Sequence, residues 1–137
     1  MNVKRLILAS IVIWVVSFAF IMLTCGWLFT WVYEIPPLIW VSPEDMNLGL
    51  SIASGLLTAF LFTLVYAIFY KGIPGKGVKK GMIYGILLWL VGPLVGTLVM
   101  PVYMTIAWTV VIYWIIQMFI LKLILGALVG AIYKPKK

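Results

Sequence analysis

The sequence predicts an all-α membrane protein with four transmembrane helices, and three observations carry this prediction. Hydrophobic residues make up 66% of the 137 residues and charged residues only 9%, whereas soluble domains contain roughly 25% charged residues. Long apolar runs supply the about 20 residues that a helix needs to cross a bilayer. These runs are continuous and do not alternate with polar residues, which favours helices over the strands of a membrane barrel.

The first predicted helix covers about residues 4–33. Adjacent prolines at Pro36 and Pro37 follow it, and such a pair cannot continue a helix. Aromatic residues gather around this break, as they do where helices leave the hydrocarbon core for water. These residues are Trp27, Trp31, Tyr33 and Trp40.

The second predicted helix covers about residues 43–70. Ser42 is a favourable N-cap and Pro43 suits the first helical position. Two acids follow at once and complement the positive end of the helix dipole. A basic loop rich in glycine, residues 71–81, comes after the helix and ends it.

The third predicted helix covers about residues 78–99, and the fourth covers about residues 102–133. Gly92–Pro93 predicts a kink within the third helix, because proline and glycine are common causes of kinks. Met100–Pro101 predicts a tight connection without charge between the two helices. All these elements belong to one predicted membrane domain that covers residues 1–137.

Charged residues divide between the two ends of these four spans. All three acids, Glu34, Glu44 and Asp45, fall on one side. Nine of the ten basic residues fall on the other: Lys4, Arg5, Lys71, Lys76, Lys79, Lys80, Lys134, Lys136 and Lys137. The positive-inside rule therefore predicts a multi-pass protein of the cell membrane, with both termini and the basic loop in the cytoplasm.

The net charge of +7 would suggest a nucleic-acid partner in a soluble protein. Here the lysines flank apolar runs, so orientation and contact with anionic lipid on the cytoplasmic side explain them better. We predict headgroup contacts for Lys76, Lys79 and Lys80, and no nucleic-acid partner. The basic loop does not predict a nucleotide site, because it lacks the Walker spacing and has no serine or threonine after its lysine.

Residue types that carry catalysis are scarce in this sequence. It has no histidine and one cysteine, Cys25, and its three acids lie near the predicted outer surface. Histidine is the commonest general base and a frequent metal ligand. The sequence therefore predicts no enzyme, no metal site and no cofactor.

The two halves of the chain resemble each other weakly. A shift of 75 residues places Lys4–Arg5 on Lys79–Lys80 and Trp14 on Trp89. The match favours two duplicated helical hairpins that form a parallel repeat about an axis along the membrane normal. The alternative is chance, because apolar sequences draw on few residue types.

Small residues recur at four-residue spacing on the third and fourth predicted helices. Such patterns let two helix backbones approach closely. The pattern is typical of helix packing within one chain; homo-oligomerisation and a glycine-lined path are the alternatives. The residues concerned are Gly81, Gly85, Gly92, Gly96, Gly126 and Gly130.

Lys122 interrupts the apolar run of the fourth predicted helix. It precedes Lys134 by twelve residues, which is roughly 18 Å along a helix axis. A lysine at that depth costs about 2.5–3.5 kcal/mol on insertion scales, and no predicted span interior contains an acid to pair with it. Either Lys122 snorkels towards the headgroups, or it contacts a partner subunit or lipid together with Gln117, or it serves transport.

Four stretches carry a resemblance to a known set of proteins: Met1 to Arg5, Trp40 to Asn47, Gly75 to Gly85, and Leu128 to Lys134. They resemble small four-helix prokaryotic integral membrane proteins of unknown function. The resemblance implies a four-helix fold and a membrane location. It implies no activity and assigns no role to any residue.

Taken with the small-residue patterns, Lys122 predicts a structural or accessory protein that associates with itself or with another membrane protein. The second interpretation is a small oligomeric channel or transporter for ions or small molecules. In that case Lys122, Gln117 and the Gly92–Pro93 break would line or gate a path.

Overall fold

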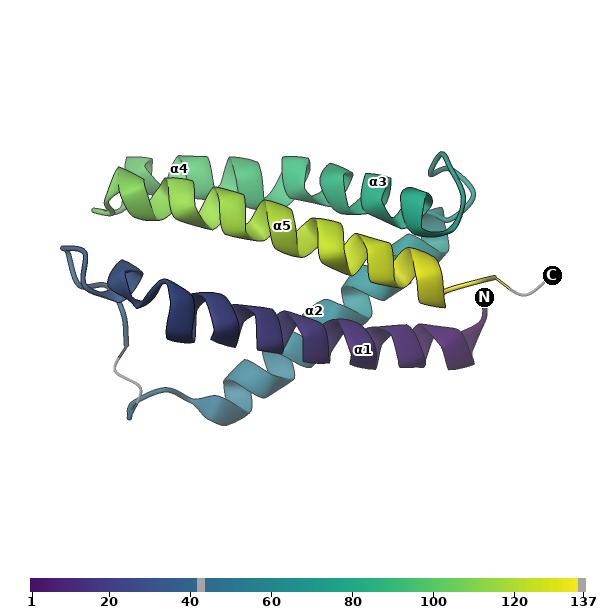
Figure 1. Cartoon of the computed structure of the whole chain (residues 1–137), viewed down its shortest axis with the longest axis horizontal. Helices are drawn as coiled ribbons and strands as arrows, with labels where there is room; N and C mark the ends of the chain where they lie inside the picture. Colours follow the sequence, from purple (N-terminus) through teal and green to yellow (C-terminus); the bar gives the residue numbers. More distant parts are fainter. Residues whose placement is uncertain (42–43, 136–137) are drawn as a thin grey trace.

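The computed structural model describes residues 1–41 and 44–135, and these residues form helices and loops without strands. Four helical stretches are long and apolar enough to cross a membrane (Figure 1). They are Val3–Leu28, Leu48–Phe69, Gly77–Tyr103 and Trp108–Ile132. The chain therefore has the fold of a four-helix membrane protein, and the predicted fold class is confirmed.

The first span changes helix type along its length. It comprises α1 (Val3–Leu23) and a π-helical segment, η1 (Thr24–Leu28), and a short 3-10 helix, η2 (Thr30–Tyr33), follows. The Asn2 side chain caps α1 by accepting a hydrogen bond from the Arg5 N–H at 3.3 Å. The predicted uniform helix over residues 4–33 is thus three successive segments.

The second span, α2 (Leu48–Phe69), begins later than the predicted residue 43. The Asn47 side chain caps it by accepting a hydrogen bond from the Leu50 N–H at 2.9 Å. Asparagine caps helices as well as serine does, and Asn47 directly precedes the apolar run. The predicted cap at Ser42 and Pro43 lies outside the described residues.

The third span comprises α3 (Gly77–Trp89), a π-helical segment, η3 (Leu90–Leu94), and α4 (Val95–Tyr103). Pro93 lies inside η3, so the π-helical turn stands at the predicted Gly92–Pro93 break. Proline removes a backbone donor, and a π-helical turn is one way in which a helix accommodates such a defect.

The fourth span, α5 (Trp108–Ile132), begins later than the predicted residue 102. The connection predicted at Met100–Pro101 is wrong, because α4 continues through Pro101 to Tyr103. Pro101 lies in the last turn of α4, where the Met104 N–H still donates to the Met100 carbonyl at 3.0 Å. Residues 104–107 make the connection instead.

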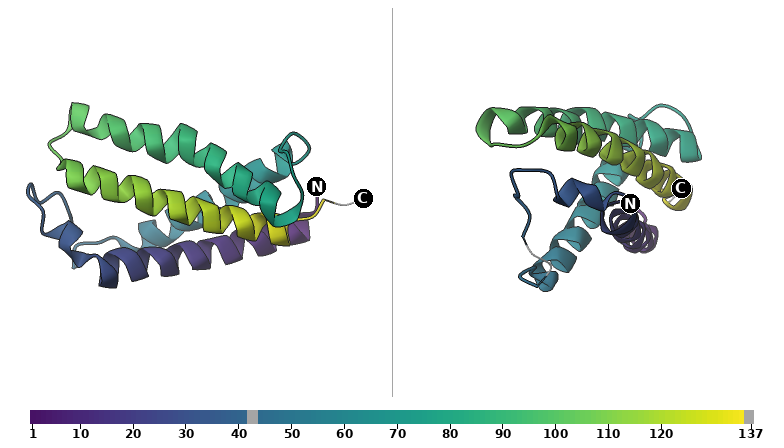
Figure 2. Two further views of the ribbon diagram at one scale, coloured as in Figure 1. Left: turned by 45° about the horizontal axis from the view of Figure 1, so that its top comes forward. Right: turned by 60° about the vertical axis from the view of Figure 1, so that its left-hand side comes forward.

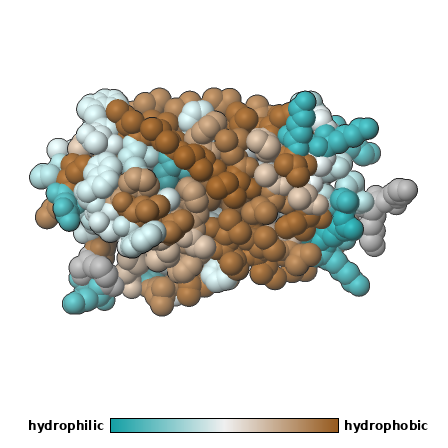
Figure 3. All heavy atoms as spheres, viewed as in Figure 1, coloured by the Kyte–Doolittle hydropathy of each residue, from teal (hydrophilic) through white to brown (hydrophobic). Residues whose placement is uncertain are grey.

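The helices pack unequally, as Figures 1 and 2 show. α3 lies along α5, α1 packs against both α2 and α5, and α2 crosses α1 obliquely. The N-terminus, the loop between α2 and α3, and the end of α5 lie at one end of the bundle, which we call the basic end. The end that holds Glu34, Glu44 and Asp45 is called the acidic end. Figure 3 shows hydrophilic residues at both ends and a mostly hydrophobic surface between them.

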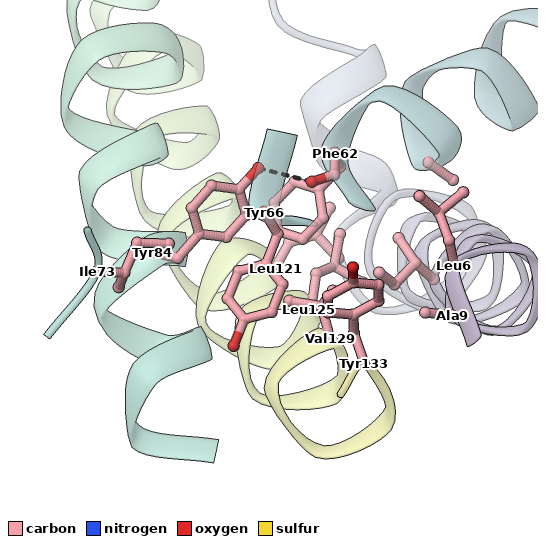
Figure 4. Packing of buried hydrophobic residues seen from close by; sticks show 12 residues of the cluster. Leu6, Ala9, Phe62, Tyr66, Ile73, Tyr84, Leu121, Leu125, Val129 and Tyr133 are labelled. Carbon is pink, nitrogen blue, oxygen red and sulfur yellow. Dashed lines mark hydrogen bonds between the residues drawn. The ribbon is translucent and has the colours of Figure 1, made fainter. Parts of the chain in front are cut away.

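A buried cluster holds the helices together in the half of the bundle nearer the basic end (Figure 4). Its aromatic members include Tyr66, Tyr84 and Tyr133. Outside this cluster many large apolar side chains are exposed, among them Val91 with 76% of its surface exposed. Exposed apolar surface on this scale fits a lipid environment and is rare on soluble monomers.

Glycines allow the close contact between α3 and α5. A Cβ built on Gly81 would overlap the carbonyl oxygen of Gly126, and one built on Gly85 would overlap that of Lys122. A Cβ on Gly130 would meet the carbonyl oxygen of Gly77. Four of the six predicted packing glycines, Gly81, Gly85, Gly126 and Gly130, therefore lie in this helix–helix contact.

The other two predicted packing glycines do not lie in such a contact. A Cβ built on Gly92 or Gly96 has no neighbour within 4 Å outside its own helical turn, and both residues are exposed. The prediction that they pack within the bundle is corrected. The physical reason is the route of the third span: beyond η3, α4 diverges from α5 and contacts it much less than α3 does, as the left view of Figure 2 shows.

Candidate functional site

Lys122 lies on α5 and points towards α2. Its ammonium nitrogen is 5.1 Å from the centre of the Phe62 ring, which is within the range of a cation–π interaction. Among the described residues, no side chain or carbonyl accepts a hydrogen bond from this nitrogen. An ammonium group has three donors, so Lys122 keeps its hydrogen-bonding capacity in a half-buried position.

Two cavities meet at Lys122. The first, of about 320 Å³, lies among α1, α2 and α5. The second, of about 270 Å³, lies between α2 and α3, and Tyr84 and Thr58 line it. Thr58 and Phe62 line both cavities together with Lys122. The lysine therefore stands where the oblique path of α2 leaves space beside α5.

Hydroxyl groups line the first cavity, which we call the Lys122 cavity. Ser17 donates to the Ile13 carbonyl at 2.7 Å. On α2, Ser54 donates to the Ser51 carbonyl at 3.1 Å and Thr58 donates to the Ser54 carbonyl at 2.8 Å. Because each hydroxyl uses its hydrogen within its own helix, its oxygen keeps lone pairs that can accept from a bound group.

Gln117 lies one and a half turns from Lys122 on α5 but has a different environment. Its side chain is 5% exposed, and its amide nitrogen donates to Thr24 Oγ1 at 2.6 Å and to Cys25 Sγ at 3.0 Å. The prediction that Gln117 contacts a partner or lipid is corrected, because its donors bind α5 to the π-helical segment η1.

A regular row of hydroxyls on the first helix was a usable signal for this contact. Ser10 and Thr24 each donate to the carbonyl four residues earlier, at 2.9 Å and 2.8 Å. With Ser17 between them these hydroxyls recur every seven residues, and this spacing marks the face of the first span that points inward. The π-helical turn that brings Thr24 and Cys25 to Gln117 has no such signal in the sequence.

The three lysines predicted at the headgroups separate into two groups. Lys76 and Lys79 are exposed at the basic end. Lys80 is 8% exposed, its ammonium donates to the Tyr70 carbonyl at 2.6 Å, and it lies 4.2 Å from the centre of the Tyr70 ring. The headgroup prediction for Lys80 is corrected: the loop folds back so that this lysine caps the end of α2.

Two glycines make that fold-back possible. Gly75 has a φ of 93° and Gly77 has a φ of 52°. Residues that have a side chain rarely adopt these positive φ angles, so the turn before α3 requires glycine at both positions. The consequence is that Lys80, in the first turn of α3, reaches the last residue before the loop.

We expect Lys80→Met to destabilise the protein and Lys79→Met to have little effect. A hydrogen bond from a charged donor contributes about 1.5–3 kcal/mol, whereas exposed substitutions usually stay within about 0.5 kcal/mol. Both changes remove one positive charge from the same turn. Unfolding in lipid nanodiscs would measure the difference, and equal stabilities would show that Lys80 acts only as a surface charge.

Comparison with protein families, with characterised proteins and with solved structures finds no match to this chain.

Proposed function

We propose that this protein is an accessory membrane protein, which binds another membrane component inside the bilayer and catalyses no reaction itself. The observation that carries the proposal is the Lys122 ammonium group, which has no hydrogen-bond acceptor in the described chain and faces a cavity. A charged group in hydrocarbon is costly and normally has a partner or a role. A bound component would supply the missing acceptor.

Snorkelling explains this geometry less well. Lys122 is ten residues from Ile132, the last residue of α5, which is about 15 Å along the axis. That distance exceeds the reach of a lysine side chain. The ammonium group also lies over the Phe62 ring of α2. These facts support a binding role.

Native mass spectrometry of the protein, gently extracted from its own membrane, tests the proposal. We expect a defined component to accompany the wild-type chain and to be lost from Lys122→Met. Lys79→Met removes the same charge at an exposed position and should keep the component. A wild-type chain that is always monomeric and free of bound components would refute the proposal.

A second candidate function is a small oligomeric channel or transporter. The hydroxyls of Ser51, Ser54 and Thr58 support it, because they line the Lys122 cavity from the start of α2 towards Lys122. Polar residues at membrane depth line water-filled paths in channels. If this function holds, Lys122→Met changes ion or solute flux in liposomes and leaves the oligomeric state unchanged.

The proposed orientation follows from charge. We place the basic end in the cytoplasm, because the basic residues flank the spans there and the acids lie at the other end. The exposed lysines Lys76 and Lys79 would then face the anionic lipids of the cytoplasmic leaflet. Cysteine labelling at the two ends of the bundle, with a reagent that does not cross membranes, tests the orientation.

A further inference from the structure

We infer that the partner in the Lys122 cavity is a transmembrane helix of another protein, which carries a carboxylate at the depth of Lys122. The inference rests on the proposed function and specifies the chemistry of the partner. Three features of the described residues support it: the distribution of charge, the depth of the lysine, and the small polar wall of the cavity.

Charge argues against a second copy of this chain as the occupant. None of the four described spans contains aspartate or glutamate. A second copy therefore offers no carboxylate at that depth, and a symmetric contact would bring two Lys122 side chains together. Like charges in a medium of low dielectric constant repel each other strongly, so the complementary group must come from a different protein or from lipid.

Depth argues against a lipid phosphate. Lys122 is 14 residues from Trp108 and ten from Ile132, the two ends of α5, or about 21 and 15 Å along the axis. Lipid phosphates lie outside a hydrocarbon core about 30 Å thick. A carboxylate on a transmembrane helix is held at a fixed depth by that helix, so it meets Lys122 without a deformation of the bilayer.

The wall that α2 presents to the cavity suits a helix. Ser51, Ser54 and Thr58 line the cavity, and all three are exposed in the isolated chain. Small residues let a second helix backbone approach closely. Gly55 lies at the contact between α2 and α1 instead. A Cβ there would be 3.0 Å from Trp14 Nε1, so this glycine lets α2 lie against α1.

The chemistry of the contact follows from these groups. The Lys122 ammonium would donate a charge-assisted hydrogen bond to one carboxylate oxygen of the partner. The Thr58 hydroxyl lines the same space and can turn from its own helix to donate to the other oxygen. Both charges are then compensated inside the bilayer, so the pair specifies both the partner and its register.

The test reconstitutes the full chain in phosphatidylcholine vesicles with synthetic transmembrane helices of leucine and alanine. The helices carry glutamate, glutamine or leucine at the central position, and energy transfer measures association. We expect the glutamate helix to bind the wild-type chain about tenfold more tightly than the glutamine helix, which is about 1.4 kcal/mol. Lys122→Arg and Lys79→Met should keep this preference, and Lys122→Met should lose it.

Several results would overturn the inference. They are equal binding of the glutamate and glutamine helices, a glutamate preference that persists in Lys122→Met, and a preference that Lys79→Met also abolishes. Thermal unfolding of Lys122→Met alone verifies that this variant is folded. If anionic phosphatidylglycerol in the vesicles removes the preference from the wild-type chain, the cavity is a lipid site.

Failure of the carboxylate inference can be distinguished from failure of the proposed function. A native component that depends on Lys122, without any preference for the glutamate helix, would keep the accessory role and remove only the carboxylate partner. Absence of any native component would remove the accessory role itself.

Discussion

Alanine at Gly126 should destabilise the protein by about 3 kcal/mol or more, and leucine there should separate α3 from α5. The Cβ of either residue would overlap the Gly81 carbonyl, and it would come within 3.2 Å of the Gly85 Cα. Backbone atoms of two packed helices cannot move aside to relieve this overlap, whereas the end of a flexible side chain could. Overpacking costs about 1–3 kcal/mol where side chains adjust, so a clash between backbones belongs at or above that limit.

Gly96 provides the matched control for this experiment. It has the same small-residue spacing, but a Cβ built there has no neighbour within 4 Å. Gly96→Ala and Gly96→Leu should therefore leave stability unchanged or raise it by up to about 1 kcal/mol, because a residue with a side chain replaces glycine inside α4. Reversible unfolding in a bilayer mimic measures all four variants. Similar losses at Gly126 and Gly96 would contradict the α3–α5 contact described above.

These two glycines show what the sequence can predict. Their spacing on a helix marks both as sites of close approach, and this local property follows directly from residue identity. Which glycine meets another helix depends on the path of the third span after η3. That path follows from a π-helical turn around Pro93, and a proline predicts a defect without predicting the direction in which the helix leaves it.

The candidate site likewise has one residue that the sequence predicts and neighbours that only the fold brings to it. The cost of a buried lysine singles out Lys122 from the sequence alone. Its neighbours Phe62 and Thr58 lie on α2, more than fifty residues earlier in the chain, and only the oblique crossing of α2 brings them to it. Gln117 shows the limit of the same reasoning. Its polarity predicted a partner outside the chain, but its amide donates to Thr24 of η1 in the same chain.

The internal duplication stays a prediction. Each proposed hairpin begins with a span that contains a π-helical segment, η1 in the first and η3 in the second. The helices pack differently, however: glycines bring α3 and α5 into backbone contact, whereas α2 crosses α1 next to Trp14. It is this difference in packing that opens the Lys122 cavity on one side of the molecule.

Tyr84→Ala should cost about 3–4 kcal/mol, because it removes both a ring that fills the contact between α3 and α2 and the hydrogen bond of its hydroxyl to the Phe62 carbonyl. The Tyr84 ring centre is 5.0 Å from that of Phe62 and 5.1 Å from that of Tyr66, and its side chain is 3% exposed. Loss of a ring of roughly 100 Å³ leaves a cavity, which costs about 24 cal/mol per Å³. The same change should weaken binding at Lys122, since Tyr84 supports Phe62 beside the lysine.

Two phenylalanine variants separate the hydroxyl groups from the rings. The Tyr84 hydroxyl donates to the Phe62 carbonyl at 2.6 Å (Figure 4), so Tyr84→Phe should lose about 1 kcal/mol. The Tyr66 hydroxyl is buried and has no hydrogen-bond partner among the described residues. Burial of an unsatisfied hydroxyl costs about 1–3 kcal/mol, so Tyr66→Phe should leave stability unchanged or raise it.

The different expected outcomes make this pair of variants decisive, because only Tyr84→Phe should lower stability. Both changes remove one oxygen from neighbouring rings of the same buried cluster, so a general effect of lower polarity would move both stabilities in the same direction. Destabilisation by Tyr66→Phe would mean that its hydroxyl has a partner in the membrane, and because this side chain is fully buried, an enclosed ordered water would be the group to seek. A neutral Tyr84→Phe would mean that the ring alone, without its hydrogen bond, holds α3 against α2 and keeps Phe62 in place beside Lys122.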